Sequence, residues 1–276
     1  MKLSFTTLGC PDWSFDKIIG QASALGYQGI EIRGVDGEML AEKIAQFQPG
    51  VQRDTLRALR KAGIEMCGFG TSVNFHDAEK TAEMLAQGKA AIDVCHAMGI
   101  PAVRVFGDRI GEGDEAKIIQ QVIDGVQALC DYAEGTGVQV LLEVHGEFNT
   151  LERVKAVAEG VRSEQFGILW DVAHSDKVYG DDFMAFYEPL KPYIRHTHFK
   201  DHVRGDKEFK LCRLGEGDIP IEAIVRQLLK DGYDGWFSLE WEKKWHPELP
   251  GAEVAYPDFI RIMTAIPDRS EDTRSL

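Results

Sequence analysis

Four side chains able to bind a metal follow short apolar runs in the second half of the chain: Glu143, Asp171, His198 and Glu240. Three carboxylates close to one imidazole would repel one another strongly without a cation, and a divalent ion removes that repulsion. A set rich in oxygen, with one imidazole and no sulfur, suits Mn²⁺, Mg²⁺ or Co²⁺, and Zn²⁺ accepts the same donors. The residue types therefore predict one divalent metal site, with the choice of ion left open.

These residues can meet only if the chain folds so that the ends of its strands converge. Strand-like and helix-like runs alternate along the chain, a pattern typical of parallel strands joined by helices. Strands are predicted over residues 3–9, 29–33, 64–71, 102–107, 139–145, 167–174, 194–200 and 236–241. Helices are predicted over 15–25, 52–62, 78–98, 115–134, 151–161, 182–190, 221–230 and 257–265. Eight alternations indicate a single (β/α)8 TIM barrel over residues 1–266, followed by a polar C-terminal tail over 267–276.

The competing fold is a doubly wound open sheet. That fold usually has a glycine-rich phosphate-binding turn after its first strand. This chain has Gly9-Cys10-Pro11-Asp12-Trp13 there, and GxGxxG occurs nowhere in it. The closed barrel is the better prediction.

In a TIM barrel the active site lies at the C-terminal ends of the strands, where the four candidate ligands are expected. His196 and His198 are two residues apart on one strand, so both point to the same side. His198 is nearer the mouth and is the predicted ligand. His196 is predicted to be hydrogen-bonded in the layer below.

Composition excludes several classes of function. Acidic residues outnumber basic ones, 45 against 31, and a net charge of -14 argues against a nucleic-acid partner. No apolar run approaches the roughly 20 residues of a membrane span, and the N-terminus lacks the apolar core of a signal peptide. The five cysteines contain no CxxC pair, which favours a reducing environment. We therefore expect a soluble, cytoplasmic protein; its oligomeric state is open, and a homo-oligomer is compatible with the sequence.

The segments around the candidate ligands resemble the sugar phosphate isomerase/epimerase superfamily with the xylose isomerase-like TIM barrel. Its members include ketose 3-epimerases, hydroxypyruvate isomerase and inosose dehydratase. The most specific segments are Leu-Glu143, Trp-Asp171-Val-Ala-His174, His196-Thr-His198-Phe-Lys200-Asp201 and Gly-Asp-Gly-Trp-Phe-Ser-Leu-Glu240. The resemblance implies that Glu143, Asp171, His198 and Glu240 bind the metal, and that His174 and Arg204 contact substrate oxygens.

Such a site can act on a small sugar or keto-polyol. A divalent ion that holds a carbonyl oxygen and a neighbouring hydroxyl stabilises the enediolate formed when the adjacent C–H loses its proton. Glu143 and Glu240 come from non-adjacent strands and are assigned both metal binding and acid/base catalysis. Isomerase or epimerase is the leading prediction, with a dehydratase as the alternative.

Other side chains are candidates for binding the substrate. Lys200 points the same way as His198 and could protonate a departing hydroxyl, which would favour the dehydratase, although a salt bridge is the simpler interpretation. Trp13 and Phe106 could pack against the C–H face of a sugar, although most barrel aromatics belong to the core.

Two further functions remain to be weighed. Apurinic endonucleases share this barrel, but the resemblance implies a three-zinc site with more histidines than the eight present here and a basic groove. A non-catalytic sugar-binding barrel would normally show an incomplete ligand set, whereas all four ligand types are present. An enzyme is therefore predicted.

Overall fold

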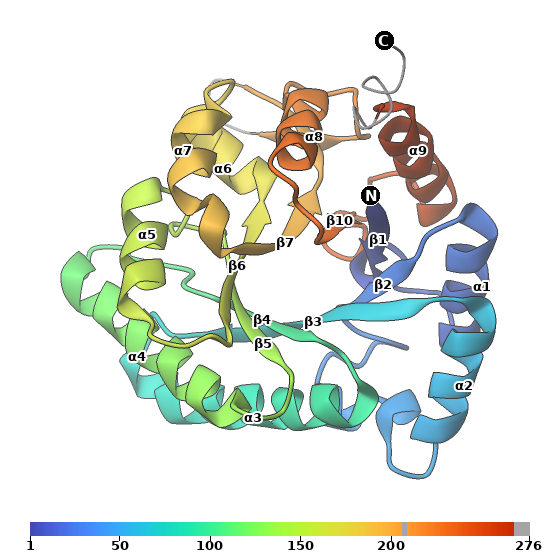
Figure 1. The fold of residues 1–276 in the computed structure, drawn as a ribbon, viewed down its shortest axis with the longest axis horizontal. Coiled ribbons are helices and arrows are strands. Elements are labelled where there is room, and N and C mark those ends of the chain that lie inside the picture. Colours follow the sequence, from blue (N-terminus) through green and yellow to red (C-terminus); the bar gives the residue numbers. More distant parts are fainter. Residues whose placement is uncertain (206–208, 268–276) are drawn as a thin grey trace.

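The computed structural model describes residues 1–205 and 209–267 of the 276-residue chain. Within them one closed barrel of parallel strands is surrounded by helices (Figure 1). The predicted C-terminal tail, apart from residue 267, lies outside the described residues.

The barrel closes because β1 pairs with β2 on one side and with β10 on the other. Its strand order is β1-β10-β7-β6-β5-β4-β3-β2. The strands are β1 (Lys2–Thr6), β2 (Gly29–Ile32), β3 (Glu65–Asn74), β4 (Ala102–Phe106), β5 (Gln139–Glu143), β6 (Phe166–Asp171), β7 (Ile194–Phe199) and β10 (Trp236–Leu239). The predicted TIM barrel is confirmed, and the open sheet is excluded.

The helices form the outer layer seen in Figure 1. They are α1 (Phe15–Leu25), α2 (Gln52–Ala62), α3 (Thr81–Met98), α4 (Glu115–Ala133), α5 (Leu151–Gly160), α6 (Val172–Tyr179), α7 (Phe183–Leu190), α8 (Ile221–Lys230) and α9 (Ala252–Ala265). Short 3-10 turns are η1 (Thr7–Gly9), η2 (Ala41–Lys43), η3 (Ala45–Phe47), η4 (Ala78–Lys80) and η5 (Lys191–Tyr193). Helices α1 and α2 end at Gly26 and Gly63, which adopt the left-handed conformation (φ 84° and 69°) that favours glycine.

The prediction for the sixth strand was wrong at its end. A strand was expected to run to residue 174, but β6 stops at Asp171 and α6 begins directly after it. Asp171 Oδ1 accepts hydrogen bonds from the backbone N–H groups of Ala173 (2.9 Å) and His174 (3.2 Å), so the carboxylate caps the helix. His174 therefore lies in the first turn of a helix at the barrel mouth.

A two-stranded hairpin after β7 was not predicted. Strands β8 (Asp201–Val203) and β9 (Lys210–Cys212) pair antiparallel outside the barrel. The Asp201 carboxylate anchors the following loop, because it accepts hydrogen bonds from the N–H groups of Gly215 (2.8 Å) and Gly217 (3.1 Å). This hairpin continues directly from the strand that carries His198.

The last helix begins earlier than predicted. Its predicted start was Pro257, but α9 already begins at Ala252, so Pro257 lies inside the helix. Pro257 has no backbone N–H to donate, and α9 nevertheless continues past it to Ala265. No helix in the described ranges is both long and apolar enough to cross a membrane.

Candidate metal and active site

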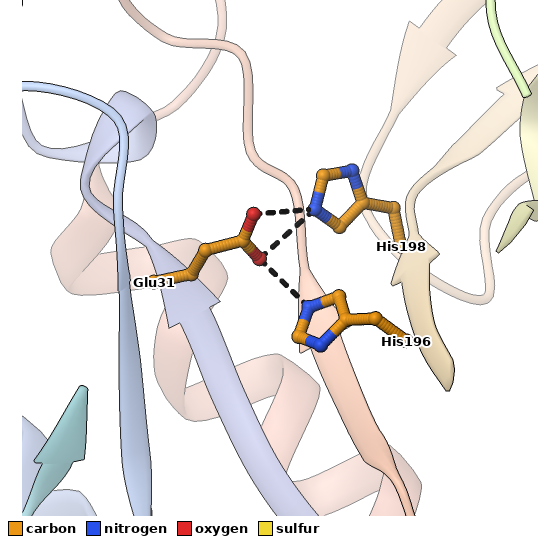
Figure 2. Close-up of side chains that lie close together, drawn as sticks. All are labelled: Glu31, His196 and His198. Atoms are coloured by element: carbon orange, nitrogen blue, oxygen red, sulfur yellow. Dashed lines mark hydrogen bonds and ion pairs between the residues drawn. The ribbon is translucent and has the colours of Figure 1, made fainter. Parts of the chain in front are cut away.

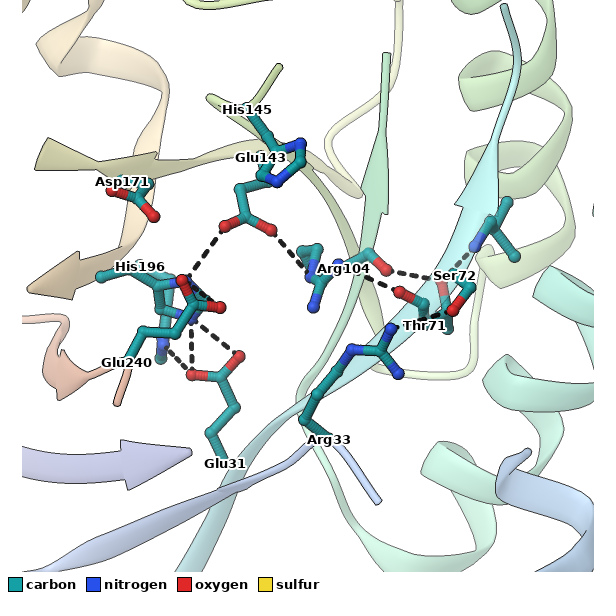
Figure 3. Close-up of polar contacts among 12 residues, drawn as sticks. Glu31, Arg33, Thr71, Ser72, Arg104, Glu143, His145, Asp171, His196 and Glu240 are labelled. Atoms are coloured by element: carbon teal, nitrogen blue, oxygen red, sulfur yellow. Dashed lines mark hydrogen bonds and ion pairs between the residues drawn. The ribbon is translucent and has the colours of Figure 1, made fainter. Parts of the chain in front are cut away.

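The four predicted ligands meet at the C-terminal mouth of the barrel. Glu143 ends β5, Asp171 ends β6, His198 lies on β7, and Glu240 follows β10. One ligand atom of each lies within 4.8 Å of the others, and all four residues are buried. Figure 3 shows the Glu143, Asp171 and Glu240 carboxylates converging from three sides. We call these four residues the ligand cluster.

The imidazole of His198 lies between two carboxylates of the cluster. Its Nδ1 is 3.1 Å from Glu143 Oε1 and 3.4 Å from Glu240 Oε1. Since these two oxygens reach the same nitrogen, both carboxylates face the space at which Nδ1 points. The donors are three carboxylates and one imidazole, a set that fits a hard or borderline divalent ion.

Two cationic side chains border the cluster. Lys200 Nζ lies 2.6 Å from Glu240 Oε2, 2.7 Å from Asp171 Oδ2 and 2.6 Å from Glu242 Oε1. Arg104 Nε lies 2.9 Å from Glu143 Oε2. Glu143 Oε2 and Asp171 Oδ2 are buried and face these cations at ion-pair distance, but neither oxygen has a hydrogen bond of good geometry.

The cations that border the cluster do not fully compensate the negative charge of its carboxylates, as the pKa of Asp171 shows. Burial raises the pKa of Asp171, the Lys200 ammonium opposes that rise, and the charges of Glu240 and Glu143 add to it, giving a pKa of about 7. Burial acts the same way on Glu240, but Lys200 and His198 outweigh it and hold the pKa of Glu240 well below its ordinary value. One carboxylate thus competes for a proton near neutrality, which is the situation that a divalent ion relieves.

A layer that the sequence interpretation missed lies directly below the cluster. Glu31, on β2, is buried and lies 2.9 Å from His196 Nε2 and 2.9 Å from His198 Nε2 through its Oε2 (Figure 2). The prediction that His196 is hydrogen-bonded below the site is thereby confirmed. The sequence contains one signal for this layer, which is a single acidic residue in the otherwise apolar run Gly-Ile-Glu31-Ile.

A cavity of about 750 Å³ lies beside the cluster. His145 and His174 contribute to its wall, with ring centroids 4.3 Å apart, and Glu242 connects the wall to Lys200. Phe106 packs against His145 with ring centroids 4.5 Å apart and ring planes tilted by 49°, and the Arg104 guanidinium lies 4.0 Å from the centre of the Phe106 ring. His174 thus lines a cavity that a substrate could enter, whereas Phe106 contacts His145 and does not itself line the cavity.

Burial lowers the pKa of His174 well below its ordinary value, and the nearby ammonium of Lys200 lowers it further. The imidazole of His174 is therefore neutral near pH 7. A neutral imidazole can both donate and accept a hydrogen bond, which suits contact with a hydroxyl group.

Two other predicted substrate contacts are placed differently. Arg204 Nη2 lies 2.6 Å from Asp176 Oδ1, and its Nη1 lies 2.9 Å from Asp181 Oδ1, so its guanidinium is engaged in ion pairs. Trp13 packs edge-on against Tyr256 with centroids 5.7 Å apart, a contact typical of the core. Substrate binding by either residue stays a prediction.

Comparison with known proteins places this chain in a family. The chain is 24% identical over 251 residues to fructoselysine 3-epimerase from Shigella flexneri, covering 87% of this chain and 90% of that protein. It is 26% identical over 264 residues to inosose dehydratase from Serratia proteamaculans (strain 568), covering 83% of each. The solved structure of the IOLI protein with a bound zinc atom superposes with a TM-score of 0.78 at 19% identity, covering 96% of this chain and 99% of that one.

A family model described as the xylose isomerase-like TIM barrel matches residues 19–261. That range includes all four residues of the ligand cluster as well as Glu31 and Lys200. The chain belongs to the xylose isomerase-like TIM barrel family and, as its named relatives indicate, is an enzyme.

Proposed function

We propose that the protein is a divalent-metal-dependent isomerase or epimerase of a small sugar or keto-polyol. The observation that carries the proposal is the convergence of Glu143, Asp171, His198 and Glu240 at the barrel mouth. The epimerase and dehydratase relatives support a sugar-directed enzyme, and the zinc atom in the IOLI protein supports a metal in this fold.

A divalent ion held by these four residues would polarise the substrate carbonyl and stabilise the enediolate formed beside it. Glu143 and Glu240 approach from β5 and from the end of β10, so their carboxylates can address a substrate carbon from two sides. One carboxylate removes the proton next to the carbonyl. Return of a proton by the other carboxylate to the opposite face inverts the carbon, whereas return to the neighbouring carbon isomerises the sugar.

A dehydratase is the second candidate, and Lys200 is the observation that favours it. Its ammonium is buried and lies beside Asp171 and Glu240, so it is held next to the reacting centre. After removal of the proton next to the carbonyl, a β-hydroxyl can leave if an acid protonates it. Lys200 is the side chain placed to give that proton.

The reaction is tested on protein stripped with a chelator and reloaded with Mn²⁺, Co²⁺, Mg²⁺ or Zn²⁺ in turn. A panel of ketoses, inososes and hydroxypyruvate is followed in D₂O by proton NMR. We expect metal-dependent loss of the signal of a carbon-bound proton next to a carbonyl. The product then separates isomerase, epimerase and dehydratase.

Matched variants locate the chemistry. Glu143→Gln and Glu240→Gln should each abolish exchange, because each change removes a proposed metal ligand and one of the two also removes the base that accepts the carbon-bound proton. Glu159→Gln on α5 changes a carboxylate exposed on the outer helix layer and should leave exchange unchanged. A wild-type protein that binds none of the four ions would overturn the proposal, as would exchange of equal rate in stripped protein.

A further inference from the structure

Glu31 collects hydrogen-bond donors from two other strands. Its Oε2 lies 2.9 Å from His196 Nε2 and 2.9 Å from His198 Nε2, and accepts a 3.0 Å hydrogen bond from Ser238 Oγ. Its Oε1 lies 3.0 Å from His198 Nε2. Glu31 is on β2, the histidines are on β7, and Ser238 is on β10, so one carboxylate links three strands inside the barrel. Figure 2 shows Glu31 with the two histidines.

These contacts determine which nitrogen of His198 is available. A carboxylate accepts hydrogen bonds and does not donate them, so His198 presents Nε2–H to Glu31. By the same rule the other ring nitrogen, Nδ1, donates to Glu143 Oε1 at 3.1 Å and lies 3.4 Å from Glu240 Oε1, and an ion bound at Nδ1 would take the place of that proton. The hydrogen bond to Glu31 therefore orients the ring with Nδ1 toward the ligand cluster.

We propose that Glu31 is a positioning residue that fixes the tautomer and the orientation of His198, so that Nδ1 is the atom offered to the metal. This inference rests on the metal site proposed above. Carboxylate–imidazole pairs behind a metal raise the basicity of the ligand and remove its freedom to rotate. Glu31 would do both from the opposite side of the barrel, without touching the ion.

His196 and Ser238 support Glu31 itself. A carboxylate with only one donor could rotate about its side-chain bonds, whereas His196 on β7 and Ser238 on β10 both contact Oε2 of Glu31 and hold that oxygen in place. All of these residues are buried, so water does not compete for the carboxylate. His196 thus helps to orient Glu31, which in turn orients His198.

Glu31, His196 and His198 also lie close enough together to hold an ion of their own. The 2.9 Å contacts are ordinary hydrogen-bond lengths, and Ser238 completes a set of donors around Oε2. The number of ions bound per chain separates the two interpretations.

The first measurement is metal affinity, determined by competition with a chelating dye for Zn²⁺ and for Mn²⁺. Glu31→Gln should bind each ion about 10–100-fold more weakly than wild type, the usual cost of removing such a partner. Asp176→Asn is the matched control, because Asp176 makes a similarly buried 2.8 Å contact with His202 Nε2 outside the ligand cluster. Its affinity should stay within about threefold of wild type, since it removes no partner of a metal ligand.

The second measurement is the tautomer of His198, read from long-range ¹H–¹⁵N correlations of the imidazoles in Zn²⁺-loaded wild-type protein. We expect a proton on Nε2 and the metal on Nδ1. This spectrum decides the question even if Glu31→Gln fails to fold.

Three results would overturn the inference while leaving the proposed function intact: unchanged affinity in Glu31→Gln, a metal on Nε2, or a second ion that only wild type binds. A wild-type protein that binds no ion would instead remove the proposed function, and this inference with it.

Discussion

The ammonium of Lys200 lies 2.6 Å from Glu240 Oε2, so a predicted metal ligand already has a cation as its neighbour. The same ammonium lies 2.7 Å from Asp171 Oδ2. Two of the three carboxylates of the ligand cluster are therefore partly neutralised by the protein itself. An ion that enters the cluster has to share these oxygens with Lys200.

Replacement of Lys200 by methionine should strengthen metal binding, because it removes a competing charge. Unit charges about 4 Å apart interact by roughly 4 kcal/mol at an effective dielectric of 20, so at least about a tenfold gain in affinity is expected. Chelator competition with Mn²⁺ measures the effect. Lys177→Met, at a cavity lysine outside these contacts, serves as the control. Weaker binding in Lys200→Met would mean that the ammonium holds the ligands in position.

Loss of the buried Arg104 should lower the free energy of unfolding far more than loss of a partly exposed arginine that also pairs with a carboxylate. Arg104 and Glu143 are both buried and 2.9 Å apart, so Arg104→Met leaves a buried charge without its partner. We expect a loss of about 3–5 kcal/mol in the free energy of unfolding. Arg213 pairs with Asp258 and is partly exposed. Arg213→Met should therefore lower the free energy of unfolding by less than about 1 kcal/mol. Urea unfolding of both metal-free variants makes the comparison, and equal losses would contradict it.

The pair of Asp176 and His202 predicts a pH dependence of stability. Burial acts to raise the pKa of Asp176, but hydrogen bonds from His202 and Arg204 outweigh it, so this pKa lies below its ordinary value of 3.8. The folded protein therefore binds the proton more weakly than the unfolded chain does. The stabilisation is present above about pH 4 and is lost as the pH falls through the folded pKa.

Unfolding of wild type and of Asp176→Asn should accordingly differ most near pH 7, by roughly 1–3 kcal/mol. The difference should shrink as the pH falls below about 4, because the unfolded chain then takes up the proton first, and it should vanish once the folded carboxyl is protonated as well. Denaturant titrations at pH 7 and pH 3 supply the two values. If the difference in unfolding free energy were larger at pH 3 than at pH 7, the pKa of Asp176 would be raised by folding, which would contradict the prediction.

The barrel was predictable because its signals are local and repeated. Alternating strand and helix patterns and glycines such as Gly26 at helix ends mark the elements one by one. The convergence of the predicted ligands was predictable for a related reason, since Glu143 and Asp171 each end a strand that points at the barrel mouth. Parallel strands bring such positions together without any knowledge of side-chain packing.

Other features depend on contacts between distant segments, and spacing does not reveal them. The partner of His198 is Glu31, which is 167 positions away and on the opposite side of the barrel. Similarly, α6 was missed because the Asp171 side chain caps it, which a pattern of apolar residues does not record. Likewise, Asp201 at the start of the β8–β9 hairpin bonds to glycines of a later loop, a contact that spacing does not reveal.

Asp201 should control the order of that later loop. Its carboxylate accepts hydrogen bonds from the backbone N–H groups of Gly215, Gly217 and Ile219. Asp201→Ala should therefore speed amide hydrogen exchange at these three positions, while amides of β5 and β6 keep their protection. Mass spectrometry of exchange at the peptide level resolves the two regions. Uniform acceleration across the barrel would show a global loss of stability instead.

The pairing of β1 with β10 has a consequence for the newly made chain. Glu240 follows β10, so a ribosome must release nearly the whole barrel before the ligand cluster has its fourth member. Until then Glu143, Asp171 and His198 form only part of the cluster, and Glu31 on β2 awaits β7 and β10. If the proposed metal site is real, the complete site would therefore form only after β10 has paired with β1, and metal binding would follow synthesis of nearly the whole barrel.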